Sequence, residues 1–352
     1  MRGIVMKRIR DYGIITGRLS PGPLNKITDV EGVLVGHATI DTEEHKTGVT
    51  IILPCPDNPF SRKLTAAAYV HNGFGKSQGL VQIEELGTLE TPIALTNTLN
   101  VGLVHDALVE LVLEQCKKEG IQARSINPVV GECNDSSLNK ISERVVGIRE
   151  VRKAAENAER DFNEGAVGAG TGTVCFGLKG GIGSASRQFE IAGRTYTLGV
   201  LVQSNFGSTE NLVIGGRAVG KEIASLTEPA VLDQGSVMVI TATDLPVSDR
   251  QLKRIIKRTG VGLSRTGSYM GHGSGDIMIG FTTANRIPEE MEQELLSIRI
   301  LKESALETAF IAAAEAAEEA VLNSLAMAET TVGYQKTVKH SLTELWLSGL
   351  ES

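Results

Sequence analysis

The sequence predicts a layered α+β sandwich. Strand-like and helix-like segments are mixed along the chain, and several strands follow one another directly, which favours such a sandwich over a doubly wound parallel sheet. Glycine is frequent, with 39 residues, whereas aromatic residues make up only 4% of the chain. We therefore expect a core of Val, Ile, Leu and Ala with many close backbone contacts. The 352 residues suffice for a sizeable core, and we expect a single domain over 1–352.

The composition excludes several classes of function. A net charge of -7 gives no basic surface for nucleic acid, and no apolar segment reaches the roughly 18–20 residues that cross a membrane. The basic start, Met1–Arg10, is followed by Asp11 and Tyr12 instead of an apolar stretch, so we expect no signal peptide. The cysteines stand far apart without a CxxC pair, at Cys55, Cys116, Cys133 and Cys175. They predict buried thiols in a reducing, cytoplasmic compartment.

The first half of the chain predicts short strands interrupted by helices. Apolar runs bounded by turn residues indicate the strands, and apolar residues three and four apart indicate the helices. The strands are expected at 32–40, 47–54, 64–70, 92–96 and 127–135, and the helices at 100–120 and 151–163. Gly120 is expected to close the first helix, and Asn97 or Asn100 to cap its start. The short polar loop 41–46 predicts that the first two strands pair antiparallel.

Two glycine clusters follow, at 164–173 and 179–184. The first invites comparison with a dinucleotide-binding fingerprint, but it follows a predicted helix and has no strand-then-helix frame around it. A P-loop is excluded as well, because no Gly-Lys-Ser or Gly-Lys-Thr follows. We expect turns and close strand approaches here, and no nucleotide cofactor.

The second half predicts further strands and helices. A hairpin is expected at 189–203, with its turn at Ala192–Gly193. The other expected segments are a connection at 209–231, a strand at 237–240, a helix at 248–260, a polar glycine-rich loop at 268–276, a strand at 277–283 and a long Ala-rich helix at 301–329. Ser248 is expected to cap the helix and Gly260 to close it.

The bond between Gly235 and Ser236 lies immediately before the predicted strand at 237–240. A serine there is held on a rigid element, and the preceding glycine tolerates backbone angles that other residues avoid. The hypothesis is that the chain cuts itself at this bond, so that Ser236 becomes a new N-terminus and a nucleophile. A Gly-Ser turn leading into a core strand is the alternative that these two residues alone leave open.

Further polar spots stand at predicted strand ends or loops, at 132–135, 203–205 and 274–276. Together with Ser236 they form a plausible hydrolase set. A histidine triad through His272 is an alternative, while His37 and His71 fit core or surface positions. No G-x-S-x-G elbow and no H-E-x-x-H or similar metal spacing occurs, so we expect neither an α/β-hydrolase nor a metallopeptidase, and no metal or other cofactor.

Ordered motifs extend over nearly the whole chain. They are Pro23–His37, Thr47–Thr50, Glu132–Asp135 with Leu138–Asn139, Gly165–Gly172, Lys179–Ser184, Val202–Gly207, Gly235–Ser236 with Ala242–Asp244, and Gly273–Asp276. In these motifs the chain resembles the DmpA-type serine aminopeptidases, the family of L-aminopeptidase/D-amidase-esterases and β-peptidyl aminopeptidases. The resemblance implies a four-layer α/β/β/α sandwich, with the layering of the N-terminal nucleophile (Ntn) hydrolases but a different strand connectivity.

The resemblance also implies autocatalytic processing. Cleavage between Gly235 and Ser236 gives an α-chain of residues 1–235 and a β-chain of residues 236–352. Ser236 is then the nucleophile for self-cleavage and for substrate turnover. The implied activity is that of a serine aminopeptidase or amidase, which releases N-terminal residues from peptides, amides or esters with a free amine through an acyl-enzyme.

Further site residues follow from the same resemblance. Ser274 and Asp276 match the family's Ser-x-acid pair, in which the acid is often Glu. Asn205 matches its oxyanion-binding asparagine, and Glu132 matches the carboxylate that receives the free amine of the substrate. Asn134 is a further candidate for substrate binding.

The chain departs from the family pattern beside Glu132. The family often has Tyr where this chain has Asn134, and Tyr near Ser137, and Lys140 replaces a common Asp. This Tyr helps to line the oxyanion site in some members. Substrate preference among L-α-, D- and β-aminoacyl compounds is therefore left open.

Two alternatives stand beside the aminopeptidase. Ornithine acetyltransferase-like acyl transferases share the layered fold and self-cleavage, although their nucleophile is Thr in a different motif. An uncleaved, non-catalytic homologue would be a binding or structural protein. The resemblance implies small peptide or amide substrates and a homo-oligomer of αβ units, with no nucleic acid or membrane partner. The Ala-rich helix at 303–328 is either a packing element of that assembly or an intramolecular cover.

Overall fold

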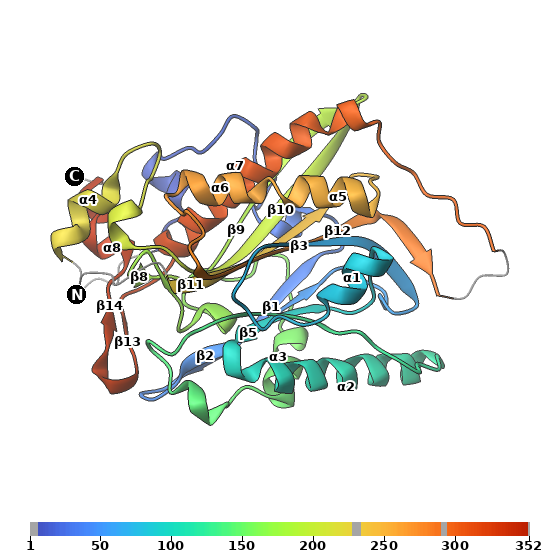
Figure 1. Ribbon diagram of the computed structural model, residues 1–352, viewed down its shortest axis with the longest axis horizontal. Helices are drawn as coiled ribbons and strands as arrows, with labels where there is room; N and C mark the ends of the chain where they lie inside the picture. The colour runs from blue at the N-terminus through green and yellow to red at the C-terminus, as the bar shows by residue number, and fades with distance from the viewer. Residues whose placement is uncertain (1–5, 227–233, 290–293, 351–352) are drawn as a thin grey trace.

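A computed structural model describes residues 6–226, 234–289 and 294–350, so part of the predicted connection at 209–231 lies outside the described residues. Two stacked β-sheets lie between two layers of helices (Figure 1). This arrangement confirms the α/β/β/α sandwich. Among the described residues, no helix combines the length and the apolar character needed to cross a membrane.

The smaller sheet has four strands in the order β1-β2-β5-β6. They are β1 (Leu34–Asp41), β2 (Lys46–Leu53), β5 (Ile93–Asn97) and β6 (Val129–Cys133). β1 and β2 pair antiparallel, as their short polar loop predicts, whereas β5 and β6 are parallel. Helix α2 (Val101–Glu119) connects the two parallel strands and, together with α3 (Ile148–Glu156), covers the outer face of this sheet.

The larger sheet has six strands in the order β4-β3-β12-β11-β10-β9. They are β3 (Arg62–Gly73), β4 (Thr88–Leu89), β9 (Ile182–Ile191), β10 (Arg194–Asn205), β11 (Gln234–Thr243) and β12 (Gly273–Pro288). β11 and β12 are parallel, and the other neighbours are antiparallel. β9 and β10 form the predicted hairpin, whose turn has positive φ angles at Ala192 (52°) and Gly193 (76°). Such a turn matches the twist of the paired strands.

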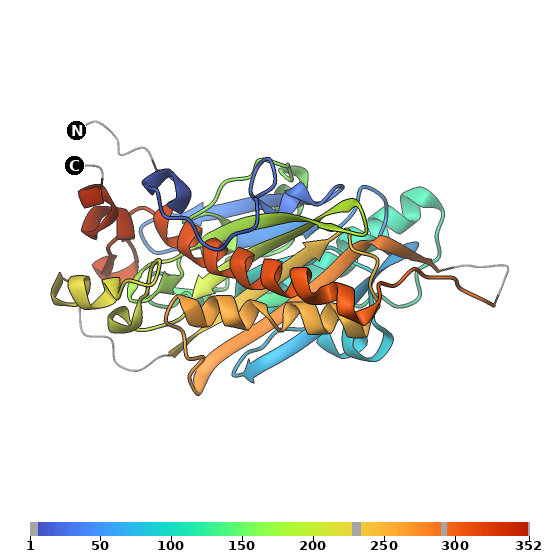
Figure 2. The same ribbon diagram turned by 90° about the horizontal axis from the view of Figure 1, so that it is seen from above.

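The outer face of the larger sheet is covered by α5 (Asp249–Ile256), α6 (Thr259–Arg265) and α7 (Glu307–Ala326). Figure 2 shows α7 lying diagonally across the strands, beside α5 and α6. A Cβ atom at Gly183 of β9 would lie 2.0 Å from the carbonyl oxygen of Ala320 in α7, so the two backbones almost touch. The Ala-rich helix, shorter than the predicted 301–329, is therefore an intramolecular cover whose small side chains permit this approach.

Shorter elements complete the fold. They are α1 (Leu80–Leu86), α4 (Val219–Ile223), α8 (Leu342–Leu345), the strand pair β7 (Val174–Cys175) and β8 (Leu178–Lys179), and the pair β13 (Thr331–Val332) and β14 (Val338–Lys339). The β7–β8 hairpin follows the first glycine cluster. It is attached to the end of β10, because the Phe176 N–H donates to the carbonyl oxygen of Phe206 at 2.7 Å.

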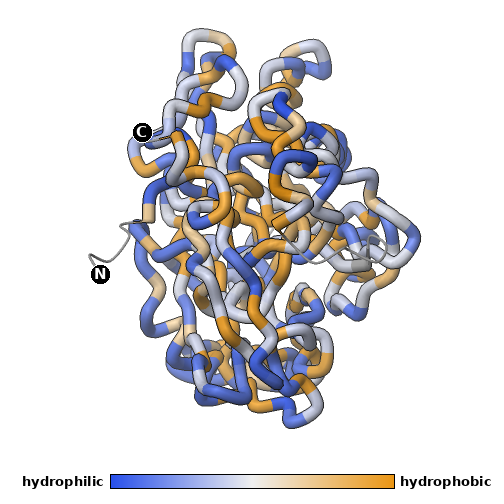
Figure 3. The backbone as a smooth tube through the Cα atoms, turned by 90° about the vertical axis from the view of Figure 1, so that its left-hand side faces the viewer, coloured by the Kyte–Doolittle hydropathy of each residue, from blue (hydrophilic) through white to orange (hydrophobic). Residues whose placement is uncertain are grey.

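Apolar side chains fill the space between the two sheets and between each sheet and its helices. Strand β11 contributes to two of these interfaces, because alternate residues point to opposite faces. Val237 and Val239 pack toward the helices, while Met238 and Ile240 pack toward the smaller sheet. In the view of Figure 3, hydrophobic segments gather in the centre and many outer loops are hydrophilic.

The helix predicted at 248–260 is two helices, so this prediction is wrong in its second half. Ser248 caps α5 as expected, because its hydroxyl accepts a hydrogen bond from the Gln251 N–H at 3.2 Å. Gly260 does not end a helix but lies in the first turn of α6. The chain begins a second helix there because Leu263 must join the core beneath α7.

Two other stretches differ from their local patterns. The helix predicted at 151–163 ends at Glu156, because the chain then turns and Glu159 bridges to β1. The loop predicted at 268–276 is a strand from Gly273 onward, because β11 and β3 provide backbone hydrogen-bond partners on both sides. Ser274 and Asp276 are therefore strand residues instead of loop residues.

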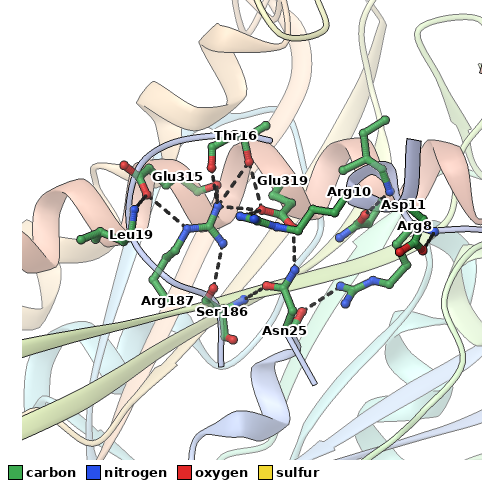
Figure 4. Close-up of polar contacts among 12 residues, drawn as sticks. Arg8, Arg10, Asp11, Thr16, Leu19, Asn25, Ser186, Arg187, Glu315 and Glu319 are labelled. Atoms are coloured by element: carbon green, nitrogen blue, oxygen red, sulfur yellow. Dashed lines mark hydrogen bonds and ion pairs between the residues drawn. The ribbon is translucent and has the colours of Figure 1, made fainter. Parts of the chain in front are cut away.

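A buried cluster around Arg187, the Arg187 cluster, joins β9, α7 and the N-terminal segment (Figure 4). Arg187 contacts the carboxylates of Glu315 and Glu319 on α7, with N–O distances of 3.2 and 2.7 Å. Arg10 forms a second ion pair with Glu319 at 2.6 Å. Although burial opposes ionisation, Arg10 and Arg187 hold the pKa of Glu319 below its ordinary value. The charges in this cluster are therefore compensated by ion pairs.

Candidate active site

Ser236 lies near the start of β11, in the middle of the larger sheet, and is 4% exposed. On one side it pairs with Asn205, the last residue of β10, and on the other with Gly275 of β12. Strand pairing therefore brings Ser236 next to two of the polar spots that the sequence singles out.

Gly235 lies where two strands approach too closely for a larger residue. A Cβ atom at this position would lie 2.0 Å from the carbonyl oxygen of Asn205 and 2.9 Å from the Cα atom of Phe206. Any side chain would push β11 away from β10 beside Ser236. The close approach of β11 and β10 therefore explains why glycine stands before the predicted cleavage bond.

Ser274 and Asp276 lie on β12 and are fully buried. The Ser274 hydroxyl donates a hydrogen bond to Asp276 Oδ1 at 2.7 Å. Ser274 is the strand partner of Gly235. By strand alternation, Ser274 and Asp276 share the helix-facing side with Met278, whereas Ser236 faces the smaller sheet. The pair thus lies beside the backbone of the Gly235–Ser236 bond, on the opposite face from the Ser236 side chain.

The side-chain amide of Asn205 has a defined orientation. Its Oδ1 accepts a hydrogen bond from the Val174 N–H at 2.9 Å. A backbone N–H can only donate, so the contacting atom must be the oxygen, and the amide NH₂ points elsewhere. Asn205 and Ser236 are directly opposite each other in the antiparallel pair, so their side chains project from the same face. This places an N–H donor on the face of the sheet that carries the Ser236 hydroxyl.

Glu132, on β6, provides a carboxylate that is 3% exposed. Its Oε1 accepts a hydrogen bond from the Lys76 N–H at 2.9 Å, and its Oε2 accepts one from the Thr98 hydroxyl. Gly75 lies between Glu132 and β12. A Cβ atom at Gly75 would lie 3.5 Å from Glu132 Oε1 and 3.9 Å from the Cα atom of Gly275. The carboxylate is therefore close to the strand position that pairs with the predicted nucleophile.

Asn134 lies on an exposed turn after β6, where its Oδ1 accepts a hydrogen bond from the Ser136 N–H at 3.0 Å. Its neighbour Cys133 points inward, with Sγ 3.5 Å from the carbonyl oxygen of Ser236. Burial raises the pKa of the Cys133 thiol well above its ordinary value. This thiol stays protonated at neutral pH and does not compete as a nucleophile.

The histidines considered as alternatives have other surroundings. The ring nitrogens of His37 lie 2.9 Å from Thr50 Oγ1 and 3.0 Å from the carbonyl oxygen of Asn163. Burial lowers the pKa of His37 to about 4. His272 precedes β12, and its ring centre lies 6.3 Å from that of Phe74. His37 is thus held on the smaller sheet, and its ring contacts do not involve the Ser236 strand.

One group of side chains has the spacing of metal ligands among the residues described, namely Glu44, His45 and Glu143. The Lys140 ammonium lies 3.1 Å from the carboxylate of Glu44 and 2.7 Å from that of Glu143. A cation of this chain already compensates the two acids. The group is therefore a surface ion-pair network.

The sequence pattern misses two supports of the site. One is the segment 74–77, whose Lys76 N–H holds Glu132. The other is Lys179, which is fully buried and donates to carbonyl oxygens of the first glycine cluster. The only local signal for Lys179 is the glycine pair that follows it, because small residues allow carbonyl groups to approach an ammonium closely.

Two stacked sheets between two layers of helices are the arrangement of the Ntn-hydrolase fold class. The chain belongs to peptidase family S58, whose family model matches residues 25–339. The chain is 38% identical to the β-peptidyl aminopeptidase BapA of Sphingosinicella microcystinivorans over 352 aligned residues, which cover 93% of this chain and 87% of that protein. It is therefore a serine-type aminopeptidase by family.

Solved structures agree with this family. A protein from Pyrococcus horikoshii OT3 is 46% identical and superimposes with a TM-score of 0.92 over 97% of this chain and 98% of that one. The L-aminopeptidase D-Ala-esterase/amidase of Ochrobactrum anthropi is 35% identical, with a TM-score of 0.90 over 97% of both chains. That protein is described as a prototype of the serine aminopeptidases and as a variant of the Ntn-hydrolase fold.

Proposed function

We propose that this chain is a self-processing serine aminopeptidase that cuts its own Gly235–Ser236 bond and then uses Ser236 to release N-terminal residues from peptides, amides or esters. The observation that carries the proposal is the strand register around Ser236. It sets the Gly235–Ser236 bond between Asn205 on one neighbouring strand and Ser274 on the other.

The nucleophile needs a base, because a serine hydroxyl attacks poorly until its proton is removed. Cleavage frees the α-amine of Ser236, whose reference pKa is about 7.7–8.0, so that it accepts a proton near neutral pH. The backbone of Ser236 lies beside the hydrogen-bonded Ser274–Asp276 pair. We propose that this pair orients the new α-amine, while the amine takes the proton of the Ser236 hydroxyl directly or through a water.

The tetrahedral intermediate carries a negative oxygen that needs a donor. The NH₂ group of Asn205 is assigned this role, since its Oδ1 is held by the Val174 N–H and its side chain shares a face with Ser236. The intermediate collapses to a Ser236 ester and releases the leaving amine or alcohol, which takes up the proton. Water then hydrolyses the ester by the same steps in reverse.

Glu132 is assigned to the substrate ammonium. A carboxylate offers about four acceptor positions, and the Lys76 N–H and the Thr98 hydroxyl occupy one on each oxygen. The remaining positions suit the ammonium of a peptide N-terminus. A substrate with a blocked amine would leave the buried carboxylate poorly compensated, which favours exopeptidase specificity.

Self-cleavage uses Ser236 and Asn205 in the same roles, but the α-amine forms only in this step, so the hydroxyl proton passes to the departing peptide nitrogen instead. The Ser236 hydroxyl attacks the carbonyl carbon of Gly235, the peptide nitrogen becomes the α-amine of Ser236, and water hydrolyses the resulting ester. The products are an α-chain of 1–235 and a β-chain of 236–352 in one domain. The proposed substrates are small peptides or amides, and the proposed form is a homo-oligomer of αβ units. The proposed location is the cytoplasm, which suits the four buried free cysteines.

The decisive experiment is Ser236→Ala, examined by intact mass and by turnover of an aminoacyl p-nitroanilide. The wild type should give two masses that sum to about the 37.5 kDa of the chain, plus the added water. Ser236→Ala should give one mass and no turnover. Ser248→Ala, which removes a hydroxyl at the start of α5, is the matched control and should be processed and active. Two fragments from Ser236→Ala would contradict the proposal.

The role of Glu132 is tested separately with substrates. Free-amine p-nitroanilides should be turned over, whereas their N-acetylated counterparts should not. Glu132→Gln should raise KM for the free-amine substrates, because the charge opposite the ammonium is lost. Equal turnover of acetylated substrates by the wild type would exclude the proposed amine site.

A further inference from the structure

Lys179 is a buried charge in contact with the polypeptide that holds Asn205. Its side chain is fully buried, and Nζ donates to the carbonyl oxygens of Gly170, Thr173 and Gly180 at 2.9, 2.9 and 2.6 Å. An ammonium has three N–H donors, whereas a neutral amine has two, so three acceptors at these distances match the charged form.

One of these carbonyl groups leads directly to Asn205. The Thr173 carbonyl accepts from Lys179, and the N–H of the same peptide group, on Val174, donates to Asn205 Oδ1 at 2.9 Å. The ammonium, the peptide group and the side-chain amide therefore form a chain of hydrogen bonds with a single direction. Each donor in such a chain strengthens the next, because polarising an acceptor makes the attached N–H more acidic.

The fold holds this chain of hydrogen bonds rigidly. Val174 and Lys179 are strand partners in the β7–β8 hairpin, so the lysine folds back over its own turn. Phe176, at the tip of the hairpin, is bonded to Phe206, the residue after Asn205. The hairpin is thus hydrogen-bonded both to the Asn205 side chain and to the backbone of the residue that follows it.

We propose that Lys179 is a positioning residue for the oxyanion site, which fixes the Asn205 amide and strengthens its N–H donor through the Thr173–Val174 peptide group. The inference rests on the proposed function, because it assumes that Asn205 binds the oxyanion. Lys179 does not touch the substrate and acts only through the peptide group and Asn205.

The same geometry gives the site a dependence on pH. Burial lowers the pKa of Lys179 to about 7, and electrostatic interactions with Asp135, just after β6, and Cys175, on β7, oppose this shift. Above that pH the lysine loses its charge and the polarisation of Asn205 weakens. The α-amine of Ser236 must be neutral to act as base, so kcat rises with pH as this amine loses its proton. At higher pH kcat falls, because Lys179 loses its charge.

The first test is Lys179→Met, with rates normalised to the processed fraction by intact mass. We expect kcat to fall about 10- to 100-fold, less than the about 10²–10³-fold for losing an oxyanion donor outright, with KM within about threefold of wild type. Self-cleavage should slow by a similar factor, since it forms the same oxyanion. The matched control is Lys26→Met, another buried lysine that donates to a carbonyl, that of Phe162, and should leave kcat unchanged.

A transition-state analogue separates positioning from general structural support. An α-aminoalkyl boronic acid forms a negatively charged tetrahedral adduct with a serine nucleophile. Lys179→Met should weaken boronate binding by the same factor as kcat/KM but leave the affinity for the product amino acid unchanged. Unchanged boronate affinity, or a loss confined to KM, would overturn the proposal.

If Lys179→Met does not fold, the pH profile of the wild type decides. A decline of kcat on the alkaline side of about pH 7 supports the role of Lys179, and a kcat that stays level to pH 9 contradicts it.

Ser236→Ala, measured in parallel with Lys179→Met, distinguishes the two proposals. Turnover by Ser236→Ala contradicts the proposed function, whereas an inactive Ser236→Ala beside a fully active Lys179→Met contradicts only the role of Lys179.

Discussion

The Arg187 cluster and the surroundings of Lys179 both bury a basic side chain completely, but they compensate its charge differently. Arg187 meets the carboxylates of Glu315 and Glu319 at 3.2 and 2.7 Å. Lys179 meets three carbonyl oxygens within hydrogen-bonding distance. Carbonyl dipoles offset desolvation less fully than opposite charges do, so burial lowers the pKa of Lys179 to about 7.

This difference in compensation distinguishes a buried charge that stabilises the fold from one that we assign to the active site. Arg187 fixes the N-terminal segment against β9 and α7 through its ion pairs and hydrogen bonds (Figure 4). Lys179 changes its charge near neutral pH and lies one peptide group from Asn205. Burial of a charge is therefore a poor sign of function by itself. Incomplete compensation beside a reactive group is the more informative sign.

The largest expected effect is on stability, from Arg187→Met. Arg187→Met removes the cation that contacts buried Glu315 and leaves Glu319 paired with Arg10 alone, and breaking a buried ion pair in this way costs about 3–5 kcal/mol of unfolding free energy. Urea unfolding measures this loss. The kcat of the remaining folded, processed protein should stay within about twofold of wild type. A large loss of kcat in the folded fraction would show that the Arg187 cluster also serves catalysis.

Asn205→Ala should lower kcat strongly and the unfolding free energy only slightly, the reverse of Arg187→Met. Loss of an oxyanion donor lowers kcat by about 10²–10³-fold, or about 2.7–4 kcal/mol of transition-state stabilisation. Among the described residues, the Val174 N–H loses its partner, and no buried ion pair is broken, so the unfolding free energy should change less than in Arg187→Met. Steady-state kinetics and urea unfolding of the two variants side by side check the contrast. An Asn205→Ala variant with wild-type kcat would remove Asn205 from the proposed oxyanion site.

Acid should act on the two regions with opposite signs. Burial raises the pKa of Asp135, near Lys179, to about 6, whereas the pKa of Glu319 is lowered. Between about pH 4 and 6, folded Asp135 holds a proton that the unfolded chain has released, so its contribution to stability falls as the pH rises. Glu319 contributes stability above its ordinary pKa, and this contribution is lost as the pH falls.

Urea unfolding of Asp135→Asn and Glu319→Gln tests these signs. Relative to wild type, Asp135→Asn should gain about 1–3 kcal/mol between pH 4 and 7. Glu319→Gln should be most destabilised at neutral pH, with a deficit that shrinks on acidification. A difference that does not vary with pH in Asp135→Asn would contradict the raised pKa of Asp135.

The smallest effect should come from Ser248→Ala, which lies in neither region. Its hydroxyl caps α5 through the Gln251 N–H, and loss of such a cap costs about 1 kcal/mol. Thermal unfolding measures the loss, and kcat should not change. This variant gives the scale of an ordinary local contact against which the two buried regions are judged. A cost as large as that of Arg187→Met would contradict the comparison.

Much of the fold could be predicted where local pattern and tertiary contacts agree. The apolar spacing of α2 and its closing Gly120, which has φ 72°, match the structure. The predictions fail where contacts with distant residues override the local pattern. Residues 273–276 are rich in glycine and polar, yet they form a strand because β11 and β3 flank them. For Lys179, the sequence offers only the glycine pair that follows it, which does not by itself predict that the ammonium is buried.

The sequence by itself determined the local elements, the Gly235–Ser236 bond at the head of an apolar strand, and the family motifs that point to Glu132, Asn205 and Ser274. These depend on residues close together in the chain. Only the tertiary structure decided that Asn205 lies opposite Ser236, that Gly75 brings Glu132 near β12, and that a buried ammonium holds the peptide beside Asn205. The reason is physical: strand register and desolvation arise from packing between segments far apart in sequence, which a local pattern does not contain.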